Sequence, residues 1–235
     1  MTKTSLIIGG NRGIGLVISN TLRKRGDKVI SISRSSLNNN KNHISVDIST
    51  IGGLKLIKAK FINKKINNLI FSHRYRGLDS IDEFKVMVES TNNIIKIFED
   101  KFLKNSSIVV LGSVATRTII HDQNANYHYT RGALDTLVKY YACTLGNKKI
   151  RINCIQPTKI FKPENKSYFL KKNNFDRKII EKITPLGRMG DAQDIADLVD
   201  FLTSDKSTFI TGTIIPVDGG LRLVSQEQIA KMFIK

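Results

Sequence analysis

The stretch LIIGGNRGIGLVI near the N-terminus limits what this chain can fold into more than any other segment. A short apolar run ends there in a glycine-rich turn, and apolar residues at helical spacing follow over residues 14–25. A tight turn between a strand and a helix needs glycine where a Cβ would clash or where φ turns positive. The free N–H groups at the start of the helix then face a phosphate. The segment therefore predicts a phosphate-binding βαβ unit with Gly9, Gly13 and Gly15 in its turn.

Short β-branched runs alternate with helical patterns along the rest of the chain. Parallel strands need crossover helices, so this alternation predicts a seven-stranded parallel sheet with helices on both faces. Asp191 is the expected N-cap of the helix over residues 192–202. Since the 235 residues contain no internal repeat and no linker, we expect a single Rossmann-type, doubly wound α/β domain over residues 1–235. The predicted strands are residues 5–8, 28–33, 43–46, 68–72, 107–111, 151–155 and 213–217, with a polar turn over residues 35–42.

The sequence argues against a membrane-spanning protein, a secreted protein and a nucleic-acid-binding protein. No apolar run reaches the ~20 residues of a membrane helix, and the N-terminus lacks a signal-peptide cleavage site, which favours a cytoplasmic protein. Cys143 and Cys154 are interpreted as buried thiols in a reducing compartment. The chain has 38 Lys and Arg against 20 Asp and Glu. These charges are spread along the chain, so they indicate either a compositional bias or attraction of an anionic ligand, and no nucleic-acid partner is expected.

The segment over residues 158–185 interrupts the alternation. It is long and basic, and it contains the aromatic residues Tyr168, Phe169 and Phe175. A connection of this length usually has a function or folds into small helices. Because it follows a strand at the carboxyl edge of the predicted sheet, we expect a basic lid over a substrate.

Two segments together resemble the short-chain dehydrogenase/reductase family. The glycine turn has the spacing G-x-x-x-G-x-G with NRGIG, and VVLGSVATRTIIHDQNANYHYTRGALDTLVKYYACTL has a serine after a strand and a tyrosine fourteen residues later. The pattern extends over residues 4–220 and is similar to 3-oxoacyl-acyl-carrier-protein reductases and related ketoreductases. The resemblance implies the strand order 3-2-1-4-5-6-7, a nicotinamide cofactor, and a homotetramer or dimer.

The resemblance implies three catalytic residues, Ser113, Tyr127 and Arg131. A tyrosine can protonate a carbonyl oxygen if a nearby cation stabilises its phenolate, and a serine hydroxyl can hold that oxygen. Tyr127 and Arg131 are four residues apart, so they share one face of a helix. Arginine stands where the family has lysine; it keeps the positive charge but cannot readily lose a proton. Tyr129 and His128 are the alternatives, and Tyr129 leaves the shared face.

The cofactor preference depends on the end of the second predicted strand. VISISRSS has no acidic residue for a ribose 2′-hydroxyl, whereas Arg34, together with Arg12 in the glycine turn, suits a 2′-phosphate. NADP is therefore favoured over NAD. By the resemblance, Asp47 points toward the adenine and Ile160 lies against the nicotinamide. The expected cofactor contacts are Gly9, Asn11, Arg12, Gly13, Ile14, Gly15, Arg34, Asp47, Ile48, Ser72, His73, Tyr127, Arg131, Pro157 and Ile160; no metal site is expected.

The family pattern changes after the fourth predicted strand. Ser72, His73 and Arg74 stand in place of small residues of the family's Asn-Asn-Ala-Gly. His73 is either a candidate acid–base residue or a loop histidine that points to solvent. The family's catalytic asparagine cannot be placed in this sequence, because different registers put Met87 or Thr91 at its position.

The pattern also changes after the sixth predicted strand. Pro157-Thr158 replaces the family's Pro-Gly, and Lys162 stands where a threonine often contacts the cofactor phosphates. The expected function is NADPH-dependent reduction of a carbonyl, or the reverse oxidation, on a small or carrier-bound anionic substrate. Two alternatives stay open. One is a catalytically degenerate relative that binds without turnover, and the other is an isomerase, epimerase or dehydratase that retains its cofactor.

Overall fold

The computed structural model describes residues 2–35 and 41–234, and within them seven parallel strands form one sheet. The strand order is β3-β2-β1-β4-β5-β6-β7, which confirms the predicted Rossmann-type fold and its order. Most of the polar turn expected over residues 35–42 lies outside the described residues. The strands are β1 (Thr4–Ile8), β2 (Lys28–Ser33), β3 (His43–Ser45), β4 (Ile66–Phe71), β5 (Phe102–Leu111), β6 (Arg151–Pro157) and β7 (Ile214–Val217).

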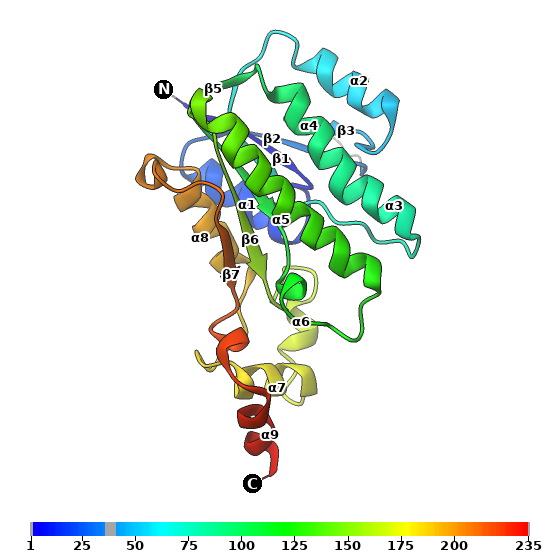
Figure 1. The fold of residues 1–235 in the computed structure, drawn as a ribbon, viewed down its shortest axis with the longest axis vertical. Helices are drawn as coiled ribbons and strands as arrows, with labels where there is room; N and C mark the ends of the chain where they lie inside the picture. Colours follow the sequence, from blue (N-terminus) through cyan, green and yellow to red (C-terminus); the bar gives the residue numbers. More distant parts are fainter. Residues whose placement is uncertain (1, 36–40, 235) are drawn as a thin grey trace.

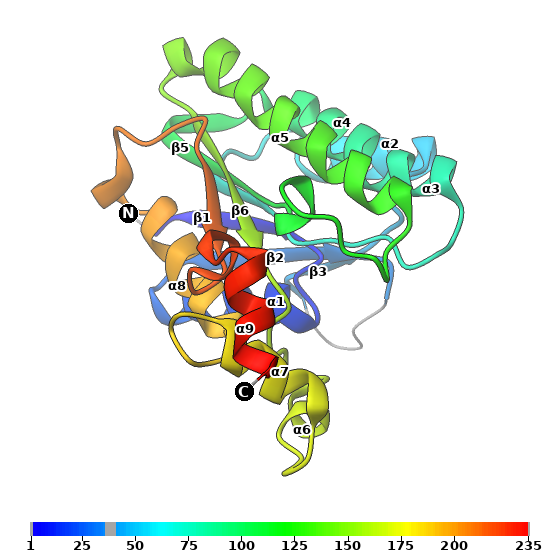
Figure 2. The same cartoon turned by 60° about the horizontal axis from the view of Figure 1, so that its bottom comes forward.

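Helices cover both faces of this sheet, as Figures 1 and 2 show. On one face α1 (Gly13–Lys24) packs beside α8 (Ala192–Leu202). The side chain of Asp191 accepts hydrogen bonds from the backbone N–H groups of Gln193 and Asp194, so the predicted cap of α8 is confirmed. The other face carries α2 (Ile51–Lys60), α3 (Ser80–Phe84), the π-helical turn η1 (Lys85–Glu89), α4 (Ser90–Phe98) and α5 (Ala125–Leu145).

The apolar stripe of α5 packs on the sheet. Leu134, Val138 and Tyr141 are buried there, as their helical spacing predicts. Cys154 in β6 is buried, but Cys143 is exposed, so its interpretation as a buried thiol is wrong. The reason is the helical period: Cys143 is two residues beyond the inward-facing Tyr141, which turns it away from the sheet.

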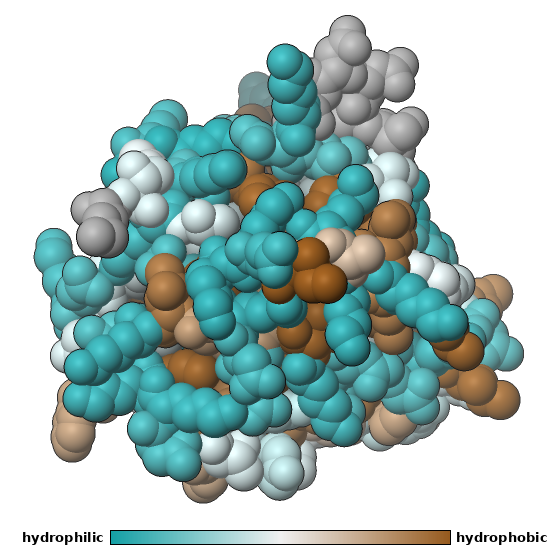
Figure 3. Space-filling view, turned by 90° about the horizontal axis from the view of Figure 1, so that it is seen from above, coloured by the Kyte–Doolittle hydropathy of each residue, from teal (hydrophilic) through white to brown (hydrophobic). Residues whose placement is uncertain are grey.

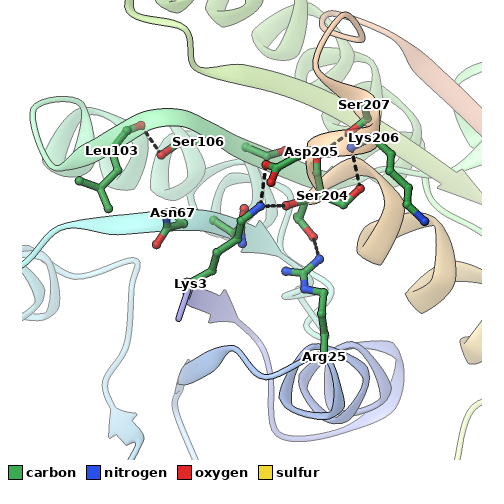
Figure 4. Close-up of polar contacts among 12 residues, drawn as sticks. Lys3, Arg25, Asn67, Leu103, Ser106, Ser204, Asp205, Lys206 and Ser207 are labelled. Atoms are coloured by element: carbon green, nitrogen blue, oxygen red, sulfur yellow. Dashed lines mark hydrogen bonds and ion pairs between the residues drawn. The ribbon is translucent and has the colours of Figure 1, made fainter. Parts of the chain in front are cut away.

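Charged side chains tie the amino-terminal edge of the sheet together (Figure 4). Lys3, just before β1, donates a hydrogen bond of 2.9 Å to Asp205 beyond the end of α8. Arg25, just after α1, pairs with Asp27 at 2.6 Å and with Asp200 of α8 at 3.0 Å. These contacts join β1, α1 and α8 at the edge opposite the carboxyl ends of the strands.

The predicted lid over residues 158–185 contains two short helices, α6 (Lys166–Phe169) and α7 (Phe175–Ile183). They lie beyond the carboxyl end of β6, on the same side as α9 (Gln226–Ile234) (Figures 1 and 2). Phe169 is buried with its ring 5.7 Å from that of Phe161. The segment is therefore held by apolar contacts and is not an open loop.

The surface opposite α9 is mostly hydrophilic, with hydrophobic residues in small separate patches (Figure 3). None of the helices in the described part of the chain is long and apolar enough to cross a membrane.

Candidate active site

A cavity of about 460 Å³ opens at the carboxyl ends of the strands. Its wall combines the glycine turn, the ends of β2, β4, β5 and β6, the start of α5 and the segment over residues 158–185. The structure thus brings nearly all the predicted site residues to one place, where ligands bind in open α/β sheets. Those lining it are Gly9, Asn11, Arg12, Gly13, Ile14, Arg34, Asp47, Ile48, Ser72, His73, Ser113, Tyr127, Arg131, Pro157 and Ile160.

Close backbone packing explains the glycine turn. Gly9 has φ of +86°, and a Cβ there would lie 2.7 Å from the backbone of His73. Gly15 does not line the cavity; a Cβ at this buried position would overlap the carbonyl oxygen of Gly9. Gly13 begins α1, and no side chain caps the first turn of that helix. The turn thus presents backbone N–H groups without a side-chain cap, an arrangement that fits a dinucleotide phosphate.

One end of the cavity is lined by Arg34 and Asp47. Burial acts to raise the pKa of Asp47, but hydrogen bonds from Ser49 and the charges of Arg34 and Lys85 outweigh it and lower that pKa. Asn11 of the glycine turn donates a hydrogen bond of 2.6 Å to Ser33 at the end of β2. A carboxylate and a guanidinium therefore stand together where the resemblance places the adenosine of a dinucleotide.

The middle of the cavity is strongly basic, which the sequence only partly revealed. Burial and the charges of Arg12 and Arg74 lower the pKa of Arg76, and Glu164 opposes them. Burial and Arg74 likewise lower the pKa of Lys162, against the effect of Glu164. The carboxylate of Glu164 also reaches the glycine turn, since a Cβ on Gly13 would lie 3.0 Å from its Oε1. Arg76 and Glu164 were not predicted, because both belong to loops without a periodic pattern.

Tyr127 and Arg131 share one face of α5, as their spacing predicts. The guanidinium carbon of Arg131 lies 4.4 Å from the centroid of the Tyr127 ring. Arg131 is only 3% exposed, and burial lowers its pKa, while Tyr127 and Glu83 act to raise it. A cation in this position stabilises negative charge on the tyrosine.

Ser113 follows β5 and is buried beside the same cavity. It caps the 3₁₀ turn η2 (Val114–Thr116), and its Oγ accepts a hydrogen bond of 3.2 Å from the N–H of Ala115. Since the oxygen is the acceptor in this bond, the hydroxyl proton is left to donate. Behind it, Gln156 donates bonds of 2.7 Å to both Thr116 and Asp135, which joins η2 to β6 and α5.

The neighbours of Tyr127 do not replace it in the cavity. Tyr129 is 48% exposed and does not line the cavity. The ring nitrogens of His128 lie 2.8 Å and 3.3 Å from the backbone carbonyl oxygens of Ala115 and Ile120. His128 therefore ties η2 and the following loop to α5.

His73 is held inside the wall and does not point to solvent. Its Nε2 lies 2.9 Å from the carbonyl oxygen of Val86, and its ring meets that of Phe71 edge-on at 5.9 Å. Burial lowers the pKa of His73 to about 4, and the charge of Arg131 adds to this effect, so the imidazole is neutral at physiological pH. The carbonyl it contacts belongs to η1, where Met87 lines the cavity. Thr91 lies behind it and donates a bond of 2.7 Å to the Met87 carbonyl.

Glu83 is a residue of this site that the sequence did not single out. Its carboxylate is buried at the end of α3 and lies 3.7 Å from Nη1 of Arg131. Its other oxygen accepts a bond of 2.5 Å from Asn126 at the start of α5. No helical spacing marked it in the sequence, because the π-helical turn η1 begins two residues later and breaks the register.

Comparison with known proteins settles the family. A family model described as Enoyl-(Acyl carrier protein) reductase matches residues 76–222. A tropinone reductase homolog from Arabidopsis thaliana is 32% identical over 246 residues, which cover 93% of this chain and 91% of that protein. The chain belongs to the short-chain dehydrogenase/reductase family. Members of this family are oxidoreductases that use NAD or NADP.

Two further relatives agree with this assignment to the short-chain dehydrogenase/reductase family. The 3-oxoacyl-[acyl-carrier-protein] reductase of Escherichia coli K12 is 27% identical over 244 residues, 94% of this chain and 98% of that protein. A solved short chain dehydrogenase family protein from Francisella tularensis superimposes with a TM-score of 0.82 at 27% identity. That match covers 95% of this chain and all of the solved chain.

Proposed function

We propose that this chain is an NADPH-dependent oxidoreductase that reduces a carbonyl group, or oxidises the corresponding alcohol. One observation carries the proposal: Ser113, Tyr127 and Arg131 line the same cavity as the glycine turn and Arg34. A proton donor, a carbonyl-binding hydroxyl and a dinucleotide cradle therefore meet in one place.

The residues have separate roles in this proposal. The glycine turn would hold the nicotinamide cofactor, which when bound would supply hydride for the carbonyl carbon. Ser113 donates a hydrogen bond to the carbonyl oxygen and orients it. Tyr127 gives that oxygen its proton, and Arg131 stabilises the phenolate that Tyr127 becomes.

The preference for NADP rests on Arg34. Replacing Arg34 with alanine is expected to weaken NADPH binding by about 10–100-fold, since a charge-assisted hydrogen bond is worth roughly 1.5–3 kcal/mol. NADH, which lacks the 2′-phosphate, should bind the variant as it binds the wild type. Titration calorimetry with both nucleotides measures this, with the exposed Arg23→Ala as a matched control. Equal loss of NADPH and NADH affinity would count against a 2′-phosphate contact.

The substrate class rests on cations beside Tyr127. The guanidinium carbon of Arg74 lies 5.6 Å from the Tyr127 ring centroid, and Lys162 is close enough to Arg74 for each charge to act on the other. Neither charge is needed to protonate a carbonyl. We therefore propose an anionic substrate, small or carrier-bound and from a biosynthetic reaction, whose negative group lies between them.

Replacing Arg74 with glutamine is expected to raise KM for an oxo acid by about tenfold, because one charged contact is lost. KM for the methyl ester of the same acid should be unchanged. Steady-state kinetics on the pair of compounds isolates the charge, since the two share their reacting carbonyl. A parallel rise in both values would contradict the proposed anion site.

We propose that the segment over residues 158–185 acts as the lid of this site. Thr158, Ile160 and Phe169 of this segment line the cavity beyond the carboxyl end of β6, which supports this role. The carboxylate of Glu164 lies beside Gly13, where a dinucleotide phosphate would bring like charge. The lid must therefore move Glu164 aside when the cofactor binds. By analogy with the family, we also propose a cytoplasmic homotetramer or dimer.

A further inference from the structure

The buried Glu83–Arg131 pair is the feature that the proposed reaction leaves unexplained. Both side chains are almost fully enclosed, with 7% of Glu83 and 3% of Arg131 exposed. They come from different helices, α3 and α5, and meet at 3.7 Å between Oε1 and Nη1. Each buried charge needs the other, because a lone ion in such a place is strongly disfavoured.

The carboxylate is held as firmly as the guanidinium. Asn126 donates to Oε2 of Glu83, so the carboxylate is held from α5 through both of its oxygens. On the other partner, Nη1 of Arg131 donates a bond of 3.2 Å to Thr130, and the guanidinium lies over the Tyr127 ring. The guanidinium of Arg131 thus contacts the Glu83 carboxylate, the Thr130 hydroxyl and the Tyr127 ring at once.

We propose that Glu83 is a positioning residue, which orients the Arg131 guanidinium against Tyr127 for the proton transfer. The inference rests on the proposed function, because it gives Glu83 a role in that reaction. A guanidinium is planar, so its interaction with Tyr127 depends on how the plane is oriented. The ammonium group of a lysine is a compact charge on a flexible stem and does not need such orientation. In this proposal an arginine at position 131 needs the glutamate at position 83 to orient it.

Several charged or titratable groups lie around Tyr127. Arg74 approaches from the loop after β4 and Lys162 from the lid, while His128 lies next to it on α5 with its ring centroid 6.0 Å away. The imidazole of His73, held against the Val86 carbonyl, is neutral at physiological pH because its pKa is lowered to about 4. Among the described residues, Glu83 is the carboxylate paired with Arg131. Replacing it therefore removes the negative charge that opposes Arg131 and leaves the other charges around Tyr127 in place.

Replacing Glu83 with glutamine keeps the shape and removes the charge. We expect kcat to fall about tenfold, since a catalytic group displaced by a fraction of an ångström loses much of its effect. The unopposed Arg131 also stabilises the Tyr127 phenolate more strongly. The alkaline limb of the pH–kcat profile for reduction should therefore move to lower pH, by about half a unit or more. A purely structural role would lower stability and leave this limb in place.

Three further variants make the test selective. Asp82→Asn removes the same charge from an exposed position on α3, and it should leave kcat and the pH profile unchanged. Glu83→Asp keeps the charge but withdraws it by one carbon, so kcat should fall while the limb stays in place. In an Arg131→Lys background, Glu83→Gln should lower kcat at most about twofold, because the effects of an interacting pair are not additive.

The experiment measures kcat against pH for these variants with NADPH and one reducible carbonyl, after thermal melts show which of them fold. A shifted limb with non-additive losses supports the inference. If Glu83→Gln does not fold, Glu83→Asp decides, and wild-type kcat in that variant would overturn the inference. An unshifted limb or additive losses, with an active wild type, would overturn it and leave the proposed function standing. A wild-type protein that shows no turnover would contradict both the role of Glu83 and the proposed function.

Discussion

Tyr127→Phe is expected to lower kcat for carbonyl reduction by about 10²–10⁴-fold, the usual contribution of a general acid. Phenylalanine keeps the ring that Arg131 covers and removes only the hydroxyl that donates the proton. NADPH affinity should change little by comparison. Stopped-flow measurement of NADPH oxidation, with calorimetry for binding, separates the two quantities.

Tyr129→Phe is the matched control for this change. It removes the same hydroxyl two residues away on α5, from a side chain that is 48% exposed and outside the cavity. Its kcat should equal that of the wild type. A large loss in Tyr129→Phe, or none in Tyr127→Phe, would mean that the proton comes from another group.

Arg131→Met is expected to reduce the free energy of unfolding by about 3–5 kcal/mol, the cost of leaving one partner of a buried ion pair alone. Methionine fills part of the arginine volume but leaves the Glu83 carboxylate buried and unpaired. Turnover should also fall sharply, since the nearer of the two guanidiniums over the Tyr127 ring is lost and Arg74 lies farther away, at 5.6 Å. Urea unfolding and steady-state kinetics measure the two effects.

The combined variant Glu83→Gln/Arg131→Met is the control for the stability effect. With both charges removed, much of the lost stability should return, whereas activity should not. Arg131→Lys keeps a charge for Glu83 and should be more stable than Arg131→Met. A fall in its kcat would mark the arginine as adapted to this site, and a rise would mark it as a partial loss of function.

The fold was largely predictable because its signals are local and repeated. A strand that is buried on both faces has a short run of β-branched residues in its sequence. The observed bounds of β1 and β2 accordingly lie within one residue of the predicted ones. The predicted bounds of the helix over residues 192–202 match the structure, because Asp191 is an N-cap residue that identifies where the helix begins. The exposed Cys143 shows the limit of composition: a general preference of cysteine for the core does not say which face of α5 a given position occupies.

The site was predictable only where spacing fixes geometry. Ser113, Tyr127 and Arg131 meet in one cavity because a strand end and one helix face place them. Between α3 and α4, however, the π-helical turn inserts one extra residue, so no simple helical register continues from Glu83 to Thr91. The placement of Met87 in the cavity and of Glu83 against Arg131 therefore needed the structure. The basic loops carrying Arg76 and Glu164 have no period at all.

The most direct test of the central claim is to follow a hydride label. Wild-type protein is incubated with NADPH that carries deuterium in place of both hydrogens on the reactive nicotinamide carbon, together with oxo acids and their esters, and the alcohols are examined by mass spectrometry. We predict deuterium on the carbinol carbon, with one NADPH oxidised for each alcohol formed. NADPH that binds but is never oxidised, or a product formed without the label, would contradict the reductase account and favour a non-catalytic or cofactor-retaining role.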